Sequence, residues 1–295
     1  MKIQKSFGDK FVENSALVIV LLWCLVCLYP LWVVLMSSVS DPTYVNAGKV
    51  WLFPKGFTLD GYMETFTRAN MMKGYWNTIV QTVLGTLVNI VLTIPAAYAL
   101  SKPRMTGRNV IMKMIVFTMY FSGGLIPSFI NMKNLGLLNT LWAIILAGGV
   151  SSTNLIIART FFASSIPQEL EDAAMIDGCG TFATFTRVVL PLSKAMISVI
   201  LLYYIVDHWN NYTNALYYTP GNTDYWPLQM VLRDLNQNLK NAISFGTEEE
   251  IEYFAKMLNQ VKYSCVVVAS VPVLILYPFL QKYFEKGVMI GSVKG

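Results

Sequence analysis

The chain has 295 residues, of which 55% are hydrophobic and only 13% are charged, and its formal net charge is +5. Soluble domains usually carry about a quarter of their residues as charged side chains, so this composition excludes an ordinary soluble domain and indicates an integral membrane protein. The 22 Lys and Arg residues are scattered through the polar segments rather than clustered, which argues against nucleic acid binding.

Six apolar stretches are long enough to cross the hydrocarbon core as helices, which takes about 20 residues. We place these predicted spans near residues 15–37, 76–100, 110–131, 139–163, 194–216 and 263–284. The first span follows Lys2, Lys5 and Lys10, but it is too long for a secretory signal and no small-residue cleavage site follows it. We therefore expect an all-α membrane protein in which residues 1–295 form a single transmembrane domain.

The positive charge in the short loops predicts the orientation of these spans. The loop after the second span carries several basic residues, whereas the loop after the third span carries only Lys133. By the positive-inside rule, both termini and the segments 101–109 and 164–193 are expected in the cytoplasm. The segments 38–75 and 217–262 are then expected on the outer side.

The second predicted span has a small or polar residue at every fourth position: Asn77, Gln81, Gly85, Asn89, Thr93 and Ala97. Small residues let membrane helices approach closely, and amide side chains form hydrogen bonds between helices. We therefore favour helix packing as the role of this stripe. The alternative is that the stripe lines a polar transport route.

The predicted cytoplasmic loop 164–193 has the most strongly patterned polar sequence in the chain. Pro167 suits the first turn of a helix, and acidic residues follow it where the helix dipole favours negative charge. Gly178 can adopt the left-handed conformation that ends a helix, and a second helical piece is expected before Pro191. We expect the first helix to offer a partner protein its acids and a small apolar face, formed by Leu170, Ala173 and Ala174.

This loop resembles the EAA motif of ABC importer permeases, which reads E-A-A, three residues, G, nine residues and I-x-L-P. Asp172 stands in place of the Glu and Val188 in place of the Ile, while Glu171 lies one residue early and is a second source of the carboxylate. The resemblance assigns coupling to an ATPase subunit to Glu171, Asp172, Ala173, Ala174, Gly178, Val188, Leu190 and Pro191.

The fifth predicted span is the most polar of the six. We expect one polar face of this span to line a sugar path through Tyr203, Tyr204, Asp207, Asn210 and Asn211. Carboxylate and amide groups can bind sugar hydroxyls, and aromatic rings can cover apolar sugar faces. An ionisable group such as Asp207 is costly in a bilayer and usually faces a bundle interior or a wet cavity. The alternative is that these groups join the span to its neighbours or lie near the lipid headgroups.

Short helices are expected in the two outer segments. Thr58 marks the start of one helix, and apolar residues at helical spacing predict an amphipathic helix through Leu228, Val231, Leu232, Leu235 and Leu239. Thr247 and Glu250 form a capping box, and the helix that follows is expected to run into the sixth span.

The resemblance extends over nearly the whole chain, through Asn77, 96–100, 209–210 and 286–295, which look like maltose-type carbohydrate importers and especially their oligosaccharide or polysaccharide branch. It implies an ABC importer type I permease fold in a bacterial plasma membrane. It also implies four kinds of partner besides membrane lipid: a second permease subunit, two ATPase subunits, an extracellular solute-binding protein and the carbohydrate itself. The outer segment 217–262 is expected to contact the binding protein.

The chain is expected to have no catalytic residues and to bind no cofactor or metal. It lacks a G-x-x-x-x-G-K-[ST] loop, so ATP and Mg²⁺ are expected on the partner ATPase. Its only histidine is His208, which leaves no cluster of metal ligands. Cys24 and Cys27 lie in an apolar helix, where packing is expected rather than redox chemistry.

Two other classes of transporter are alternatives to the carbohydrate importer. A secondary transporter commonly shows inverted repeats and needs an ion-coupling site, and the sequence shows neither. An ABC permease for an amino acid, a peptide or an ion would share the EAA loop, and it is the main alternative.

Overall fold

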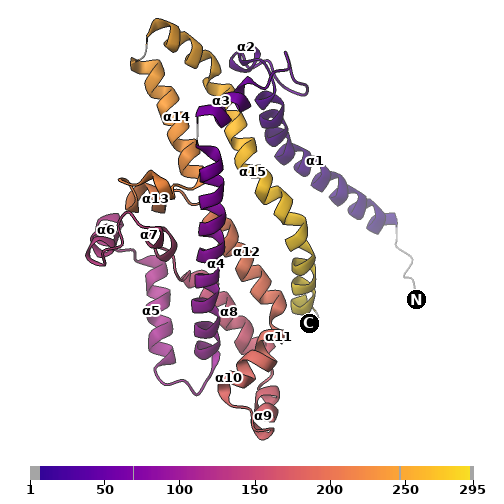
Figure 1. Cartoon of the computed structure of the whole chain (residues 1–295). Coiled ribbons are helices and arrows are strands. Elements are labelled where there is room, and N and C mark those ends of the chain that lie inside the picture. Colours follow the sequence, from indigo (N-terminus) through magenta and orange to yellow (C-terminus); the bar gives the residue numbers. More distant parts are fainter. Residues whose placement is uncertain (1–6, 69, 246, 293–295) are drawn as a thin grey trace. The chain divides into compact units, whose positions relative to one another are not determined.

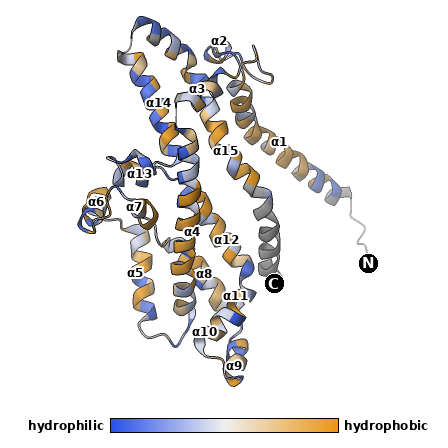
Figure 2. Cartoon of the chain, viewed as in Figure 1, coloured by the Kyte–Doolittle hydropathy of each residue, from blue (hydrophilic) through white to orange (hydrophobic). Residues whose placement is uncertain are grey.

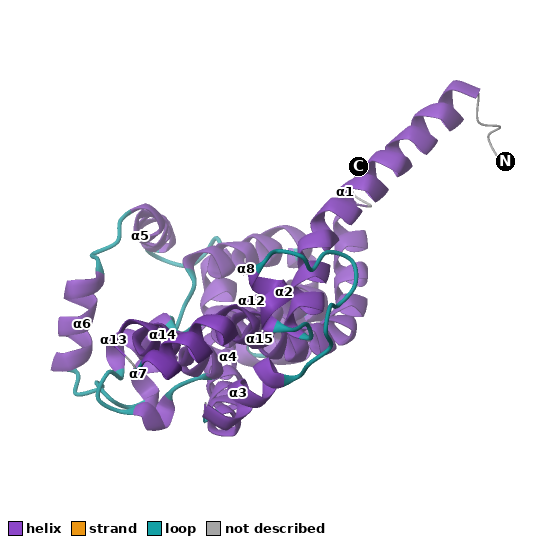
Figure 3. Ribbon diagram, turned by 90° about the horizontal axis from the view of Figure 1, so that it is seen from above, coloured by secondary structure: helices purple, strands orange, loops and turns teal. Residues whose placement is uncertain are grey.

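The computed structural model describes residues 7–68, 70–245 and 247–292. In these ranges the chain consists of helices joined by loops (Figure 1 and Figure 3), apart from one isolated antiparallel bridge between Ser40 and Phe57. The chain divides into two compact units, Met1–Ala69 with Leu232–Val271 and Asn70–Val231 with Pro272–Gly295. That residues 1–295 form a single transmembrane domain stays a prediction.

The first unit contains α1 (Phe7–Ser38), α2 (Pro42–Asn46) and α3 (Asp60–Arg68), most of α14 (Leu228–Phe245) and the first part of α15 (Glu248–Ser292). The middle of α1 is apolar (Figure 2), and most of its large hydrophobic side chains are exposed. Such a surface suits a helix that faces lipid or another subunit.

Short polar contacts start the small helices of the first unit. Asp41 caps α2 by accepting a hydrogen bond from the backbone N–H of Thr43 at 2.7 Å. The side chain and backbone N–H of Thr43 hold the pKa of the Asp41 carboxyl below its usual value. At α3, the Thr58 hydroxyl accepts a hydrogen bond from the Asp60 N–H at 3.2 Å, which confirms the predicted helix start.

α3 packs closely on α15. A Cβ added at Gly61 would lie 2.9 Å from Cγ of Gln260, so a larger residue has no room there. Gln260 also donates a hydrogen bond to the Ser40 carbonyl at 2.9 Å. These contacts fix α3 and the segment around Ser40 to the helix that carries the sixth predicted span.

The amphipathic helix predicted after residue 217 is α14, which buries Leu232, Leu235 and Leu239. α15 begins at Glu248, directly after Thr247, and continues through the sixth predicted span, as the capping box indicated. The buried face of α15 repeats at helical spacing through Phe254, Met257, Val261, Cys265 and Val268.

The second unit is built around α4 (Met71–Ser101), which packs along α8 (Ser152–Ser165) and α12 (Lys194–Asn210). α5 (Arg108–Tyr120) lies beside α8. The core between these helices includes Ile94, Ala97, Leu155, Phe162 and Ile200. Burial of this apolar surface is the main force that holds the unit together.

Two predicted spans are interrupted. Residues 110–131 fall on α5 and α6 (Leu125–Asn134), which are bent by 119°. The intervening Gly124 has a φ of 88°, a conformation that α-helices do not use. Residues 139–163 fall on α7 (Leu141–Leu146) and α8, with two glycines in the break.

The fifth predicted span also ends early, because α12 stops at Asn210 and α13 (Thr213–Tyr218) follows. Among the described residues, three helices are long and apolar enough to cross a membrane, or up to five if each bent pair is one span. The third, fourth and fifth predicted spans are therefore interrupted helices in the structure, and the number of about six membrane crossings stays a prediction.

Candidate functional site

The predicted cytoplasmic loop folds into α9 (Gln168–Ile176), α10 (Thr181–Thr184) and α11 (Leu190–Leu192), with a π-helical turn, η1 (Phe185–Val189), before α11. α9 begins directly after Pro167, which is the N-cap residue and not, as predicted, part of the first turn. Within the second unit, α9 lies at the end opposite α13 (Figure 1). The loop is thus an ordered structure of packed helical pieces.

Gly178 ends α9 in the left-handed conformation, with a φ of 81°. The N–H of Gly178 donates to the Met175 carbonyl at 3.0 Å, and the N–H of Cys179 donates to the Ala174 carbonyl at 2.9 Å. No atom lies within 4 Å of the place where a Cβ would stand at Gly178. A side chain there would therefore meet backbone strain and not a steric clash.

The acidic residues of α9 have different surroundings. Glu169 and Asp172 are exposed, whereas Glu171 is only 5% exposed and its carboxylate forms an ion pair with Lys102. Asp172, which stands at the Glu position of the motif, is therefore open to a partner. Glu171, which we had considered a second source of that carboxylate, points into its own chain.

The exposed apolar surface of α9 also differs from the predicted one. Ala174 is buried, whereas Ala173, Leu170, Met175 and Ile176 are exposed, and Ile176 is 86% exposed. Compared with the predicted face of Leu170, Ala173 and Ala174, the exposed apolar surface lacks Ala174 and gains the larger side chains of Met175 and Ile176. α10 and η1 pack against α9, so one side of this helix is turned toward its own chain.

The second half of the motif connects the loop to the core. Val188 and Leu190 are half-buried, and Pro191 lies exposed in the first turn of α11. The ring centroids of Phe185 and Tyr98 lie 4.8 Å apart, which joins η1 to α4. The helical segment Thr181–Leu192 then bends by 82° into α12.

The polar stripe of α4 is buried inside the second unit. Asn89 donates to the carbonyls of Gly148 and Gly149 at 2.8 and 2.9 Å, and its Oδ1 accepts a hydrogen bond from Nε2 of His208 at 2.6 Å. A Cβ at Gly85 would overlap the His208 imidazole. The amide therefore joins α4 to α12 and also satisfies the carbonyls at the break after α7, a link that sequence reasoning missed.

The other members of the stripe make similar contacts. Asn77 donates to the Asp224 and Trp226 carbonyls at 2.7 and 3.0 Å, and Gln81 donates to the Tyr225 carbonyl at 2.6 Å. These bonds hold the segment before α14 against α4. The preferred prediction, helix packing, is confirmed for this stripe.

The predicted sugar-path residues separate into groups. Tyr204 is only 2% exposed, and its hydroxyl lies 2.7 Å from that of Thr93, so it belongs to the packed side of α12. Asn211 lies after the end of α12, where its Oδ1 accepts the Asn214 N–H at 3.1 Å and starts α13. The exposed residues of α12 in this group are Tyr203, Asp207 and Asn210.

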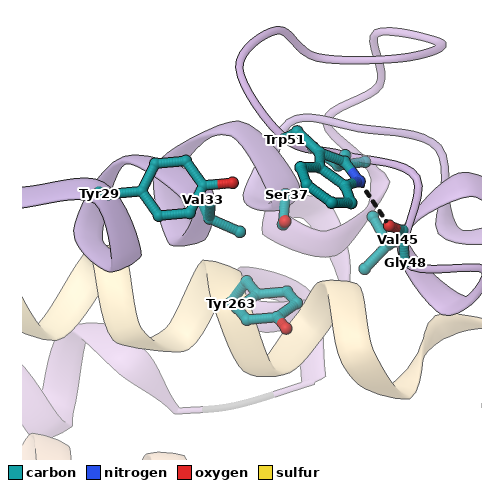
Figure 4. Close-up of a pocket in the computed structure, with 8 residues that line it drawn as sticks. Tyr29, Val33, Ser37, Val45, Gly48, Trp51 and Tyr263 are labelled. Carbon is teal, nitrogen blue, oxygen red and sulfur yellow. Dashed lines mark hydrogen bonds between the residues drawn. The ribbon is translucent and has the colours of Figure 1, made fainter. Parts of the chain in front are cut away.

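The first unit contains a cavity of about 380 Å³ that the sequence did not predict (Figure 4). Tyr29 from α1 and Tyr263 from α15 line it, together with Trp51, whose indole N–H donates to the Gly48 carbonyl at 2.9 Å. None of the described residues that line it has an acidic or basic side chain. Within the described ranges, no group of three or more His, Cys, Asp or Glu side chains is placed to hold a metal ion.

The chain is similar to known transport proteins over most of its length. A family model described as "Binding-protein-dependent transport system inner membrane component" matches residues 70–290. Protein LplC of Bacillus subtilis (strain 168) is 38% identical over 270 residues, which cover 92% of this chain and 90% of that protein. The polygalacturonan/rhamnogalacturonan transport system permease protein YtcP of the same strain is 38% identical over 279 residues, covering 93% and 95%.

A solved structure shows the same similarity in three dimensions. It is a crystal structure of a bacterial ABC transporter involved in the import of the acidic polysaccharide alginate. The similarity has a TM-score of 0.80 and 31% sequence identity, and it covers 96% of this chain and 100% of the other chain.

Proposed function

Because the chain belongs to the family of binding-protein-dependent transport system inner membrane components, we propose that it is the permease subunit of an ATP-driven carbohydrate importer. Its fold is that of an ABC importer permease. The proposed substrate is an oligosaccharide or a polysaccharide fragment, since a similar permease serves polygalacturonan and rhamnogalacturonan and a similar structure serves alginate. The alternative substrate is an amino acid, a peptide or an ion.

The observation that carries the coupling role is the two-sided character of α9. One side is fixed to the second unit through Glu171, and the other side exposes Asp172 beside Leu170, Met175 and Ile176. An exposed acid next to apolar side chains suits a groove with a basic rim on an ATPase subunit. ATP and Mg²⁺ are bound by that subunit, and this chain has no ATPase activity of its own.

The proposed assembly contains this chain, a second permease subunit, two ATPase subunits and an extracellular solute-binding protein. The chain is a multi-pass membrane protein, and we place both termini and α9 on the cytoplasmic side of the plasma membrane. The binding protein would then meet the outer segment 217–262. The sugar path is assigned to Tyr203, Asp207 and Asn210 on the exposed face of α12.

Two glycines near the end of α9 provide a matched test of the coupling role. Neither Gly178 nor Gly180 has an atom within 4 Å of a Cβ position, but Gly178 has a φ of 81° and Gly180 a φ of −69°. Gly178→Val should therefore strain the turn by about 1–2 kcal/mol, whereas Gly180→Val should not. We expect copurification of the ATPase and uptake to fall about 5- to 30-fold in the first variant only.

Normal copurification of the ATPase together with normal substrate-stimulated ATP hydrolysis in Gly178→Val would refute the coupling role. The substrate class is tested separately, by uptake of labelled oligosaccharides, amino acids and peptides into vesicles that contain the whole complex. Competition by amino acids or peptides, with none by saccharides, would favour the alternative.

A further inference from the structure

We infer that the Lys102–Glu171 ion pair makes the cytoplasmic end of α4 follow the movements of α9. The inference rests on the proposed function of α9. It assigns Lys102 and Glu171 as positioning residues, which act on transport through other elements and contact neither ATP nor sugar.

The pair joins two elements that are far apart in the sequence. Lys102 directly follows α4, and its ammonium contacts Oε1 of Glu171 in α9, 69 residues later. The Lys102 side chain is 28% exposed and the Glu171 side chain 6% exposed, so both charges are largely removed from solvent. An ion pair of this kind is firmly held, because separating the two charges leaves one of them buried without its partner.

Tyr98 extends the link from the ion pair into the core. The Lys102 ammonium lies 4.3 Å from the centroid of the Tyr98 ring, one helical turn earlier in α4. The Tyr98 ring in turn packs on Phe162 of α8, with centroids 5.6 Å apart, and on Phe185 of η1. A displacement of the Glu171 carboxylate therefore acts, through Lys102 and the Tyr98 ring, on α4, α8 and η1 together.

Chain connectivity shows why this contact is needed. α9 is joined covalently to α8 on one side and, through η1 and α11, to α12 on the other. α4 has no such link to α9, although its stripe is bonded to α12 and to the break after α7. If α12 alone followed α9, those hydrogen bonds would be strained, whereas an ion pair that moves both helices preserves them.

The test compares single variants with a charge swap in the complete transporter. Lys102→Met and Glu171→Gln each remove one charge with little change in size, and Lys113→Met is the control because Lys113 is an exposed lysine of α5, outside α9. We expect both single variants to retain the ATPase but to lower the sugar transported per ATP hydrolysed by at least about fivefold. The control should be unchanged, and the combined Lys102→Glu and Glu171→Lys variant should recover most of the ratio.

The outcomes separate this inference from the proposed function. If Glu171→Gln loses the ATPase as Gly178→Val does, Glu171 contacts the ATPase, and the inference is wrong while the proposed function stands. An unchanged transport ratio in both single variants also overturns it. Normal copurification of the ATPase together with normal ATP hydrolysis in Gly178→Val would instead refute the proposed function on which the inference depends.

A second measurement applies even if the charge variants assemble poorly. The four native cysteines are free, so they can be replaced before Cys is introduced at positions 102 and 171. A short bifunctional thiol reagent should then restore the transport ratio of this double-cysteine variant, because it replaces the ion pair with a covalent link. Inhibition of transport by the cross-link would mean that α4 and α9 must separate during the cycle, and it would overturn the inference.

Discussion

The polar stripe of α4 and the polar face of α12 lie on neighbouring helices, but their side chains have opposite surroundings. Asn89 in the stripe is fully buried and makes three hydrogen bonds, whereas Asp207 and Asn210 on α12 are exposed. The difference shows that a polar residue inside an apolar helix has two distinct uses. Small and amide residues at every fourth position join helices, while an exposed carboxylate among aromatic and amide groups is available to a ligand.

The largest loss of stability is expected at Gly85 of α4, where a side chain would overlap His208 of α12. Gly85→Ala places a methyl group on the His208 imidazole, so it should lower the free energy of unfolding by about 3 kcal/mol or more and reduce assembly of the complex. Gly148→Ala is the control, because nothing lies within 4 Å of its Cβ position. Thermal unfolding in detergent measures both, and equal melting temperatures would show that α4 and α12 are not closely packed at Gly85.

The second-largest loss of stability is expected for a change at Asn89 of α4, and Asn210 of α12 is the amide with which it is compared. Asn89→Leu should cost about 2–3 kcal/mol, because it removes the Asn89 hydrogen bonds to the Gly148 and Gly149 carbonyls and to Nε2 of His208. Asn210→Leu should change stability by less than about 0.5 kcal/mol, because Asn210 is exposed and bonds only the Val206 carbonyl of its own helix among the contacts described. If denaturant unfolding gives the two variants the same loss of stability, the contrast between the buried stripe of α4 and the exposed face of α12 is wrong.

The smallest effect concerns charge on the exposed face. Asp207→Asn keeps the size and hydrogen-bonding capacity of the side chain but removes its charge, so a bond to a sugar hydroxyl should weaken by about 1 kcal/mol. We expect saccharide uptake to fall about fivefold, with no change in melting temperature or in copurification of the ATPase. Unchanged uptake kinetics would remove Asp207 from the sugar path, and loss of assembly would show that its role is structural.

Local features of the structure were predictable from the sequence because they depend on neighbouring residues. The start of α9 after Pro167 and its end at Gly178 follow from helix capping, and α14 follows from its apolar spacing. The burial of Glu171 was not predictable, because its partner Lys102 lies 69 residues away and only the folded chain brings them together.

Which face of α12 is buried was also not predictable from the sequence, although the residues concerned are adjacent. Tyr203 and Tyr204 are adjacent, and in a helix they point about 100° apart. The sequence contains both phenols but not the position of α4, which buries Tyr204 and leaves Tyr203 exposed. The bends at Gly124 and after α7 were missed for a related reason, since apolar composition alone is the same for a straight and a broken helix.

The π-helical turn η1 has a consequence for the short helix α11 that follows it. A π-helical turn contains one more residue than an α-helical turn, so it offsets the angular register of the residues that follow it in the same helical segment. Removing one residue from Phe185–Val189 would turn the side chains of Leu190–Leu192 by about 100° around the helix axis, before the 82° bend into α12. Such a rotation would bring Pro191 toward the half-buried position of Leu190 and leave Leu192 at the exposed position of Pro191. The length of this turn therefore determines which residue of the motif's Leu-Pro pair contacts the core just before the chain enters α12.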